Sequence, residues 1–228
     1  MKPLFMIPKL NSRYDVVVIG SGHNGLVAAG YLAKAGRSVL VLEKNATFGG
    51  ATASQRVFPE YDALLSRYSY LVSLLPDKIV NDLDLDFETR MRTTASFTPW
   101  VDRAGQQRGL VLSNTDPQRS RESLLQLTGK HSTWQRYQQF LSLQTTIAKL
   151  IWPTMLNRLQ SRATFESRLE SEEQKLAWRC FVERPLGESI EQYANHDALR
   201  GLLLTDGKIG LHTHAHDPRL LQNRCFLY

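Results

Sequence analysis

The chain has 228 residues, of which 42% are hydrophobic and 22% charged, a balance typical of a globular protein with one large domain or two small ones. Its net charge of +6 is spread along the sequence and forms no basic block with aromatic residues, so we expect no nucleic-acid partner. Its apolar runs are all shorter than the roughly 18 residues of a membrane-spanning helix.

Two cysteines, Cys180 and Cys225, stand far apart and outside any C-x-x-C motif. This spacing argues against a dithiol redox centre and against a disulfide framework, so we expect a reducing, cytoplasmic compartment. The basic balance is interpreted first as a solvated surface. An anionic membrane surface is the second interpretation, and it would make the chain membrane-associated.

The first predicted element is a strand over residues 16–19 (VVVI), a β-branched run of the kind that a buried parallel strand needs. Residues 20–25 (GSGHNG) follow directly and form a G-x-G-x-x-G motif. Residues 26–35, rich in Ala and Leu, predict a helix, and Gly36 stands where that helix would end.

Each glycine of the motif has a mechanical purpose in a dinucleotide site. Gly20 makes the tight turn from strand to helix, Gly22 lets the backbone approach a pyrophosphate, and Gly25 lets the helix pack closely on the strand. The amino end of the helix then offers unpaired N–H groups and a positive dipole end to the phosphates.

A second predicted strand over residues 38–42 ends at Glu43, eighteen residues after Gly25. An acid at this spacing accepts hydrogen bonds from the adenosine ribose. Its charge would repel a ribose 2′-phosphate, so NADP is disfavoured, and the adjacent Lys44 weakens that argument only slightly. Strand, loop, helix, second strand and acid occur in register, which favours a dinucleotide site over an accidental glycine turn.

Gly49 and Gly50 complete the pattern Glu-x5-Gly-Gly. Two glycines allow the chain to pass close over a cofactor, although an ordinary flexible loop is the alternative. The run DVVVIGSGHNGLVAAGYLAKAGRSVLVLEKNATFGGATAS, residues 15–54, resembles the amino end of the phytoene-desaturase-like flavoproteins. That family includes carotenoid desaturases, isomerases and ketolases, and mitochondrial pyridine-nucleotide-disulfide-oxidoreductase-like proteins.

The resemblance implies FAD as the cofactor, and hydride transfer between flavin N5 and an apolar, isoprenoid or carotenoid substrate. It also implies a chain more than twice this long, whose carboxyl portion supplies a second flavin-binding segment, so we expect this sequence to be an amino-terminal fragment. Ala51 stands where many related flavoproteins carry Arg or Lys. The residues expected to contact the cofactor are Gly20, Ser21, Gly22, Asn24, Gly25, Glu43, Lys44, Gly49, Gly50 and Ala51.

The sequence thus predicts an α/β fold: an incomplete Rossmann-like FAD/NAD(P)-binding domain over residues 1–75, with part of an α+β substrate domain over residues 76–228. Near the end of the first domain, Tyr68 and Tyr70 lie two residues apart, which favours packing within a strand over contact with a flavin or apolar ligand. A helix capped by Asp77 is expected to follow.

The second part is predicted to begin with a hairpin, residues 97–100 and 109–112, followed by a helix with Pro117 in its first turn. Ser132 resembles the start of a capping box for a long helix, which Pro153 ends. The apolar face of this helix is expected to cover a core, and the alternative is that it lines an apolar cavity or faces lipid. Two further helices are predicted, over residues 170–181 and from a cap at Ser189 to near Gly207.

Three histidines, His212, His214 and His216, alternate along a late segment. On a strand they would share one face and could bind zinc or iron, but the adjacent Asp217-Pro218 indicates a turn, so a polar loop without metal is the preferred interpretation. No catalytic side chain is identified, and the oligomeric state is not predicted. The alternatives to a flavoenzyme are an NAD-linked dehydrogenase and an inactive dinucleotide-binding module.

Overall fold

The computed structural model describes residues 10–69, 71–72, 74–102 and 104–227. The chain divides into two compact units, Met1–Arg90 (unit 1) and Met91–Tyr228 (unit 2). The division therefore follows Arg90, whereas the sequence indicated one after residue 75. The difference arises because a short helix after residue 75 packs against unit 1.

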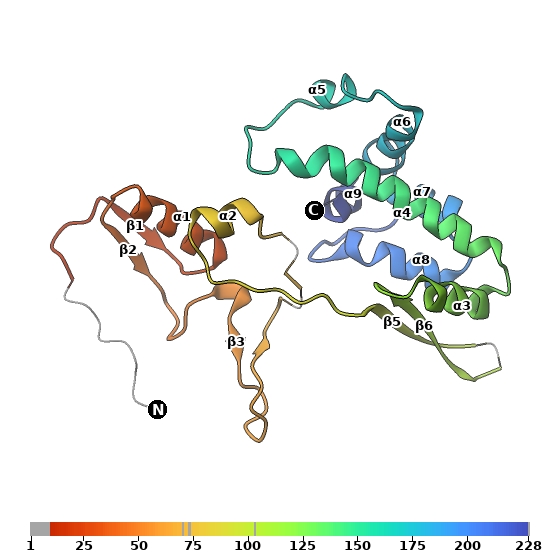
Figure 1. The fold of residues 1–228 in the computed structure, drawn as a ribbon, viewed down its shortest axis with the longest axis horizontal. Coiled ribbons are helices and arrows are strands. Elements are labelled where there is room, and N and C mark those ends of the chain that lie inside the picture. The colour runs from red at the N-terminus through yellow and green to blue at the C-terminus, as the bar shows by residue number, and fades with distance from the viewer. Residues whose placement is uncertain (1–9, 70, 73, 103, 228) are drawn as a thin grey trace. The chain divides into compact units, whose positions relative to one another are not determined.

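Unit 1 is built on a β–α–β arrangement (Figure 1). Strands β1 (Val16–Ile19) and β2 (Val39–Leu42) run parallel, with Val16 opposite Val39, and helix α1 (His23–Lys34) connects them. The predicted elements are confirmed here, except that α1 begins three residues earlier than expected. The remaining elements of unit 1 are a 3₁₀ turn Gly50–Thr52, the antiparallel strands β3 (Ser54–Gln55) and β4 (Leu65–Ser66), and helix α2 (Asp77–Asp82).

Helix α2 is fixed to α1 by polar contacts. The Tyr31 hydroxyl donates to Asp82 Oδ2 at 2.7 Å, and Lys34 pairs with Asp84 at 2.8 Å. The predicted cap at Asp77 is wrong, because Pro76 occupies the N-cap position and Asp77 lies in the first turn. There its negative charge still interacts favourably with the helix dipole.

Unit 1 lacks a hydrophobic core within the described residues. Every fully buried hydrophobic side chain of the described chain lies between Leu110 and Phe226, in unit 2. By contrast, Val17 and Ile19 of β1 are 50% and 87% exposed. A two-stranded parallel sheet is therefore left with much of its apolar surface in water, although parallel sheets are ordinarily covered on both faces.

Unit 2 begins with the predicted hairpin, formed by β5 (Thr94–Val101) and β6 (Gln107–Ser113). Helix α3 (Pro117–Thr128) follows, with Pro117 in its first turn as predicted and Asp116 accepting from the Arg119 N–H at 3.0 Å. Serine hydroxyls of α3 accept hydrogen bonds from two backbone N–H groups of β6. The outer edge of this strand is thereby covered by a helix.

The aromatic core of the helices that follow is centred on Phe140 of α4, which is fully buried. Its ring lies 5.4 Å from the ring of Phe181 and 6.0 Å from those of Tyr193 and Phe226, distances typical of favourable aromatic pairs. The helices of unit 2 after α3 are α4 (Ser132–Ile151), α5 (Arg162–Glu166), α6 (Glu172–Trp178), α7 (Leu186–Tyr193), α8 (Asp197–Leu204) and α9 (Leu221–Leu227). None of the helices in the described ranges is both long and apolar enough to cross a bilayer.

Two predicted caps in unit 2 are wrong. His131, not Ser132, precedes α4 and makes no side-chain capping bond. Ser189 lies inside α7, where its hydroxyl donates to the Cys180 carbonyl at 2.7 Å, and the chain leaves the helix after Tyr193 before α8 begins. A capping box does form, at Ser171 in front of α6.

Asn223 of α9 joins three backbone groups of other segments. Its Oδ1 accepts from the Leu186 N–H at 3.0 Å, while its Nδ2 donates to the carbonyls of Phe181 and Arg184 at 3.0 and 2.7 Å. Asn223 is only 2% exposed, so no water replaces these bonds when the side chain is removed.

We expect Asn223→Ala to lower the free energy of unfolding of unit 2 by about 3 kcal/mol, because it removes two buried hydrogen bonds to backbone groups and a third that is partly buried. Urea unfolding followed by tryptophan fluorescence measures this, since all four tryptophans lie in unit 2. Asn114→Ala, at an exposed asparagine that donates to one carbonyl, is the control and should cost less than about 1 kcal/mol. Equal losses in the two variants would contradict this role of Asn223.

Candidate functional site

The glycine loop, residues 20–25, connects β1 to α1 through a turn that only glycine accommodates. Gly20 has φ +94°, a region unfavourable for residues with a Cβ. A Cβ added to Gly25 would lie 2.4 Å from the Gly20 carbonyl oxygen, closer than any real contact. The tight turn and the close helix–strand packing expected of these two glycines are therefore both present.

The amino end of α1 is open above Gly22. Gly22 is the N-cap, no side chain makes a capping bond there, and the first turn contains no acid. No atom lies within 4 Å of the place where a Cβ of Gly22 would be. Because this twelve-residue helix ends there in N–H donors and positive partial charge, the space suits an anionic group such as a diphosphate.

Gly49 and Gly50, the Gly-Gly segment, pack directly on the glycine loop. The Gly49 N–H donates to the Ser21 carbonyl at 2.8 Å, and Gly49 pairs with Gly22 in a parallel bridge. Gly50 has φ +57°, and a Cβ there would lie 2.9 Å from the Gly22 Cα. The segment is thus held in place and is not the ordinary flexible loop of the alternative interpretation.

Glu43 is turned toward the glycine loop from the end of β2. Its Oε2 accepts from the Ser21 N–H at 2.8 Å and from the Ser21 hydroxyl at 2.6 Å, and its Oε1 accepts from the N–H and amide of Asn45, each at 2.9 Å. The Ser21 hydroxyl, followed by the backbone N–H groups of Asn45 and Ser21, lowers the pKa of Glu43 from 4.5 to about 2. The carboxylate is therefore ionised at neutral pH.

These four bonds fill the acceptor positions of a carboxylate. A ribose hydroxyl would have to replace the Ser21 hydroxyl or the Asn45 amide, both of which can rotate away while the backbone donors stay. Asn45 was not predicted as part of the site, and nothing in its spacing from Glu43 indicates the contact.

The remaining predicted contact residues are less constrained. Asn24 is exposed in the first turn of α1, and Lys44 and Ala51 are exposed on either side of the Gly-Gly segment. Tyr68 is 66% exposed with the Arg67 guanidinium over its ring, so it does not pack within a strand as expected, and Tyr70 lies outside the described residues. Contacts of all these residues with a cofactor stay predictions.

The histidine segment does not form the strand that a metal site would need. Residues 211–214 are irregular, and a turn follows at Ala215 and His216. His216 Nε2 lies 3.0 Å from Glu191 Oε1, whereas the buried Asp217 is bonded to Thr213 and Arg219. Across the described residues, no three His, Cys, Asp or Glu side chains are grouped so that they could hold a metal ion.

The geometry around the glycine loop fits the adenosine-diphosphate part of a dinucleotide. An open helix end is available for the diphosphate, two glycine segments keep side chains away from it, and an ionised carboxylate lies beside it. FAD and NAD share this part of their structure, so the fit does not by itself choose between them.

Ser21→Ala should raise the pKa of Glu43 from about 2 toward its ordinary 4.5, because the largest cause of the shift is the Ser21 hydroxyl. Carbon-detected NMR titration of the Glu43 carboxyl measures this directly. A lowered pKa adds folding stability that is present above pH 4.5 and is lost as the pH falls toward 2. The part of the unfolding free energy that is lost over this pH range should therefore be smaller in the variant. Ser54→Ala, at an exposed serine of β3, is the control, and an unchanged Glu43 titration in Ser21→Ala would contradict the assignment.

Comparison with known proteins agrees with the geometry of unit 1. Residues 18–77 match the NAD(P)-binding Rossmann-like domain family. The chain is 31% identical over 92% of its length to pyridine nucleotide-disulfide oxidoreductase domain-containing protein 2 of Rattus norvegicus, covering 39% of that protein. It is 53% identical over 51 residues, 22% of its length, to the all-trans-retinol 13,14-reductase of Macaca fascicularis, covering 8% of that protein.

A solved structure of a putrescine oxidase variant aligns with 92% of the chain and 40% of its own, at 22% identity and a TM-score of 0.47. The chain spans about 40% of the length of the curated relatives that match most of it. Unit 1 therefore contains an NAD(P)-binding Rossmann-like domain, and the rat relative that matches most of the chain is named as an oxidoreductase domain-containing protein.

Proposed function

We propose that the chain is the dinucleotide-binding part of an FAD-dependent oxidoreductase that transfers hydride between the flavin and an apolar, isoprenoid substrate. The observation that carries the proposal is the packing of the Gly-Gly segment on the glycine loop, beside the ionised Glu43. Bound flavin would supply the hydride chemistry at its ring, and the protein would supply position and electrostatics.

In this proposal each part of the loop has a separate task. The N–H groups at the start of α1 bind the diphosphate, and Gly22 leaves room for it. Glu43 accepts from the ribose hydroxyls, and its negative charge rejects a ribose carrying a 2′-phosphate. Its low pKa keeps that charge in place at any physiological pH.

The substrate class rests on relatedness and on the resemblance of residues 15–54 to phytoene-desaturase-like flavoproteins. The macaque relative is named as a reductase of all-trans-retinol, an apolar isoprenoid alcohol. We propose a substrate of that general chemistry, a class to which carotenoids also belong. The similarity to the retinol reductase covers only 22% of the chain, so the proposal extends to the class and not to retinol.

A second candidate is a dinucleotide-binding module without catalytic activity. The observation that favours it is the small extent of unit 1, whose described residues form a sheet of only two parallel strands with no buried hydrophobic core. Such a module would bind ADP through the same loop but would hold no flavin ring. An NAD-linked dehydrogenase is the third candidate and would require saturable binding of NADH.

The chain purified from cells with excess riboflavin distinguishes these candidates. The flavoprotein proposal predicts a yellow preparation that releases FAD on denaturation, identified by chromatography of the supernatant. A colourless, folded chain that binds ADP but neither FAD nor NADH would support the module and contradict the proposal. A colourless chain that saturates with NADH would support the dehydrogenase instead.

A glycine-to-alanine pair tests where the diphosphate binds. Gly22→Ala should fold normally, because its φ is −68° and no atom lies within 4 Å of the new Cβ, yet the methyl group would occupy the space above the α1 terminus. We expect at least a tenfold weaker Kd for ADP and FAD by titration calorimetry, a loss of about 1.4 kcal/mol or more. Gly201→Ala adds the same methyl to an equally open position in α8 and should leave both constants unchanged. Equal binding by the two variants would contradict the site.

A further inference from the structure

The segment that follows α4 exposes large apolar side chains. Trp152 is 45% exposed, Leu156 50% and Leu159 95%. The segment is nevertheless ordered by hydrogen bonds: the Asn157 N–H donates to the Thr154 carbonyl at 3.0 Å, and its Nδ2 donates to the Pro153 carbonyl at 2.9 Å. Single exposed leucines are common on protein surfaces, but three such side chains within eight residues form a patch that calls for a partner.

The sequence of the same region contains no acid, and a carboxylate of α6, Glu173, accepts from the hydroxyls of Ser142 and Thr146 in the middle of α4. Between Glu122 and Glu166 the sequence has no acid, and its basic residues are Lys130, Arg136, Lys149, Arg158 and Arg162. Arg162 is paired with Glu166 at 2.8 Å and with Glu183 at 3.5 Å, so its charge is largely compensated. Lys149 and Arg158 are both exposed and flank the apolar side chains.

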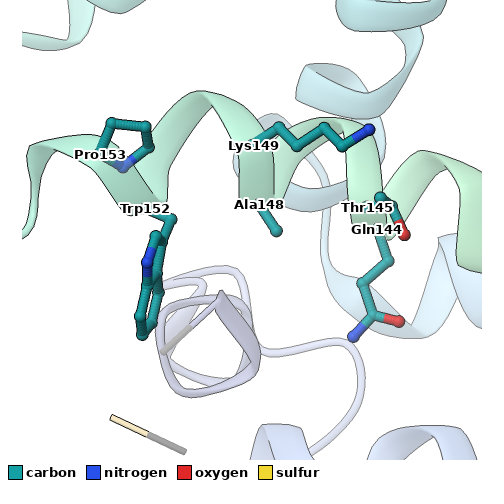
Figure 2. A pocket seen from close by; sticks show the side chains of 6 residues that line it. All are labelled: Gln144, Thr145, Ala148, Lys149, Trp152 and Pro153. Carbon is teal, nitrogen blue, oxygen red and sulfur yellow. The ribbon is translucent and has the colours of Figure 1, made fainter. Parts of the chain in front are cut away.

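A groove extends the patch along α4. It has a volume of about 520 Å³ and is lined by Gln144, Thr145, Ala148, Lys149, Trp152 and Pro153. Figure 2 shows that Ala148 and Trp152 project from the same side of the helix, while the Lys149 side chain runs along it. Trp152 therefore belongs both to the groove and to the segment after α4 that exposes Leu156 and Leu159, and Lys149 lines the same groove.

We propose that the α4 tip, residues 149–159, docks on an anionic lipid bilayer. Trp152, Leu156 and Leu159 enter the boundary between head groups and acyl chains, where tryptophan and leucine side chains of peripheral proteins lie. Lys149 and Arg158 remain at the level of the head groups and contact their phosphates. The inference does not depend on the dinucleotide site.

The charge of the α4 tip selects the lipid surface over a second copy of the chain. Two copies meeting through this surface would bring Lys149 and Arg158 of each against the same cations of the other, with no acid in the segment to compensate them. An anionic bilayer is complementary in both respects, since it offers negative charge at its surface and an apolar interior below it.

Co-sedimentation of the 228-residue chain with vesicles tests the proposal. Vesicles of phosphatidylcholine with 30% phosphatidylglycerol should bind the chain, and vesicles of phosphatidylcholine alone should bind it weakly. Binding should fall as salt is raised. The double variant Lys149→Gln/Arg158→Gln should bind roughly 25-fold more weakly, because each basic residue near an anionic surface contributes about fivefold.

Leu159→Ser removes an apolar side chain that is almost entirely in water, so the fold should be unaffected while the partition coefficient falls at least threefold. Two matched variants serve as controls and should bind like the wild type: Arg119→Gln/Arg121→Gln removes the same charge from exposed positions of α3, and Val101→Ser removes an exposed apolar side chain from β5. Thermal unfolding confirms that all variants are folded.

Two results would overturn the proposal. One is that the chain does not bind anionic vesicles, or that the control variants weaken binding as much as the α4-tip variants do. Equal weakening would show that binding depends on the net charge of the chain and not on the α4 tip. The other is sedimentation velocity in which the wild type is a dimer and Leu159→Ser is a monomer, which would make the surface an interface between copies.

Discussion

The hydrogen bond from the Gly49 N–H to the Ser21 carbonyl fixes the arrangement on which the site depends. It brings the Gly-Gly segment onto the glycine loop, and a glycine at position 50 allows the close approach, because a Cβ there would lie 2.9 Å from the Gly22 Cα. Ser21 also donates to Glu43 through its N–H and hydroxyl. One residue thus joins the three segments that the dinucleotide would contact, although it carries no charge and is itself buried.

Local patterns were sufficient where the determinants are local. The β–α–β unit, the hairpin and the α3 start with Pro117 all follow from signals within a few residues of the element they specify. Similarly, the spacing from Gly25 to Glu43 indicated which carboxylate lies beside the loop. Its saturation by Ser21 and Asn45 was not predictable, because it depends on side-chain orientations that spacing does not encode.

The wrong cap at Ser189 has a tertiary cause. Ser189 has the composition of a helix cap, but its hydroxyl is bound to a neighbouring segment instead. Ser189 bonds the Cys180 carbonyl from within α7, and Asn223 bonds the Phe181 and Arg184 carbonyls at the end of the adjacent π-helical turn. These contacts join residues 9 to 42 positions apart in sequence, beyond the reach of any local pattern.

The β1 strand has a consequence for the behaviour of the chain in solution. In the described structure it pairs only with β2, so its opposite edge presents a row of unsatisfied backbone groups, with Val17 and Ile19 exposed beside them. An uncharged, β-branched strand with an open edge is a template for intermolecular strand addition, although its length of four residues limits the number of bonds it can form. Unit 1 by itself therefore carries an intrinsic tendency to aggregate, which would disappear once another strand occupied that edge.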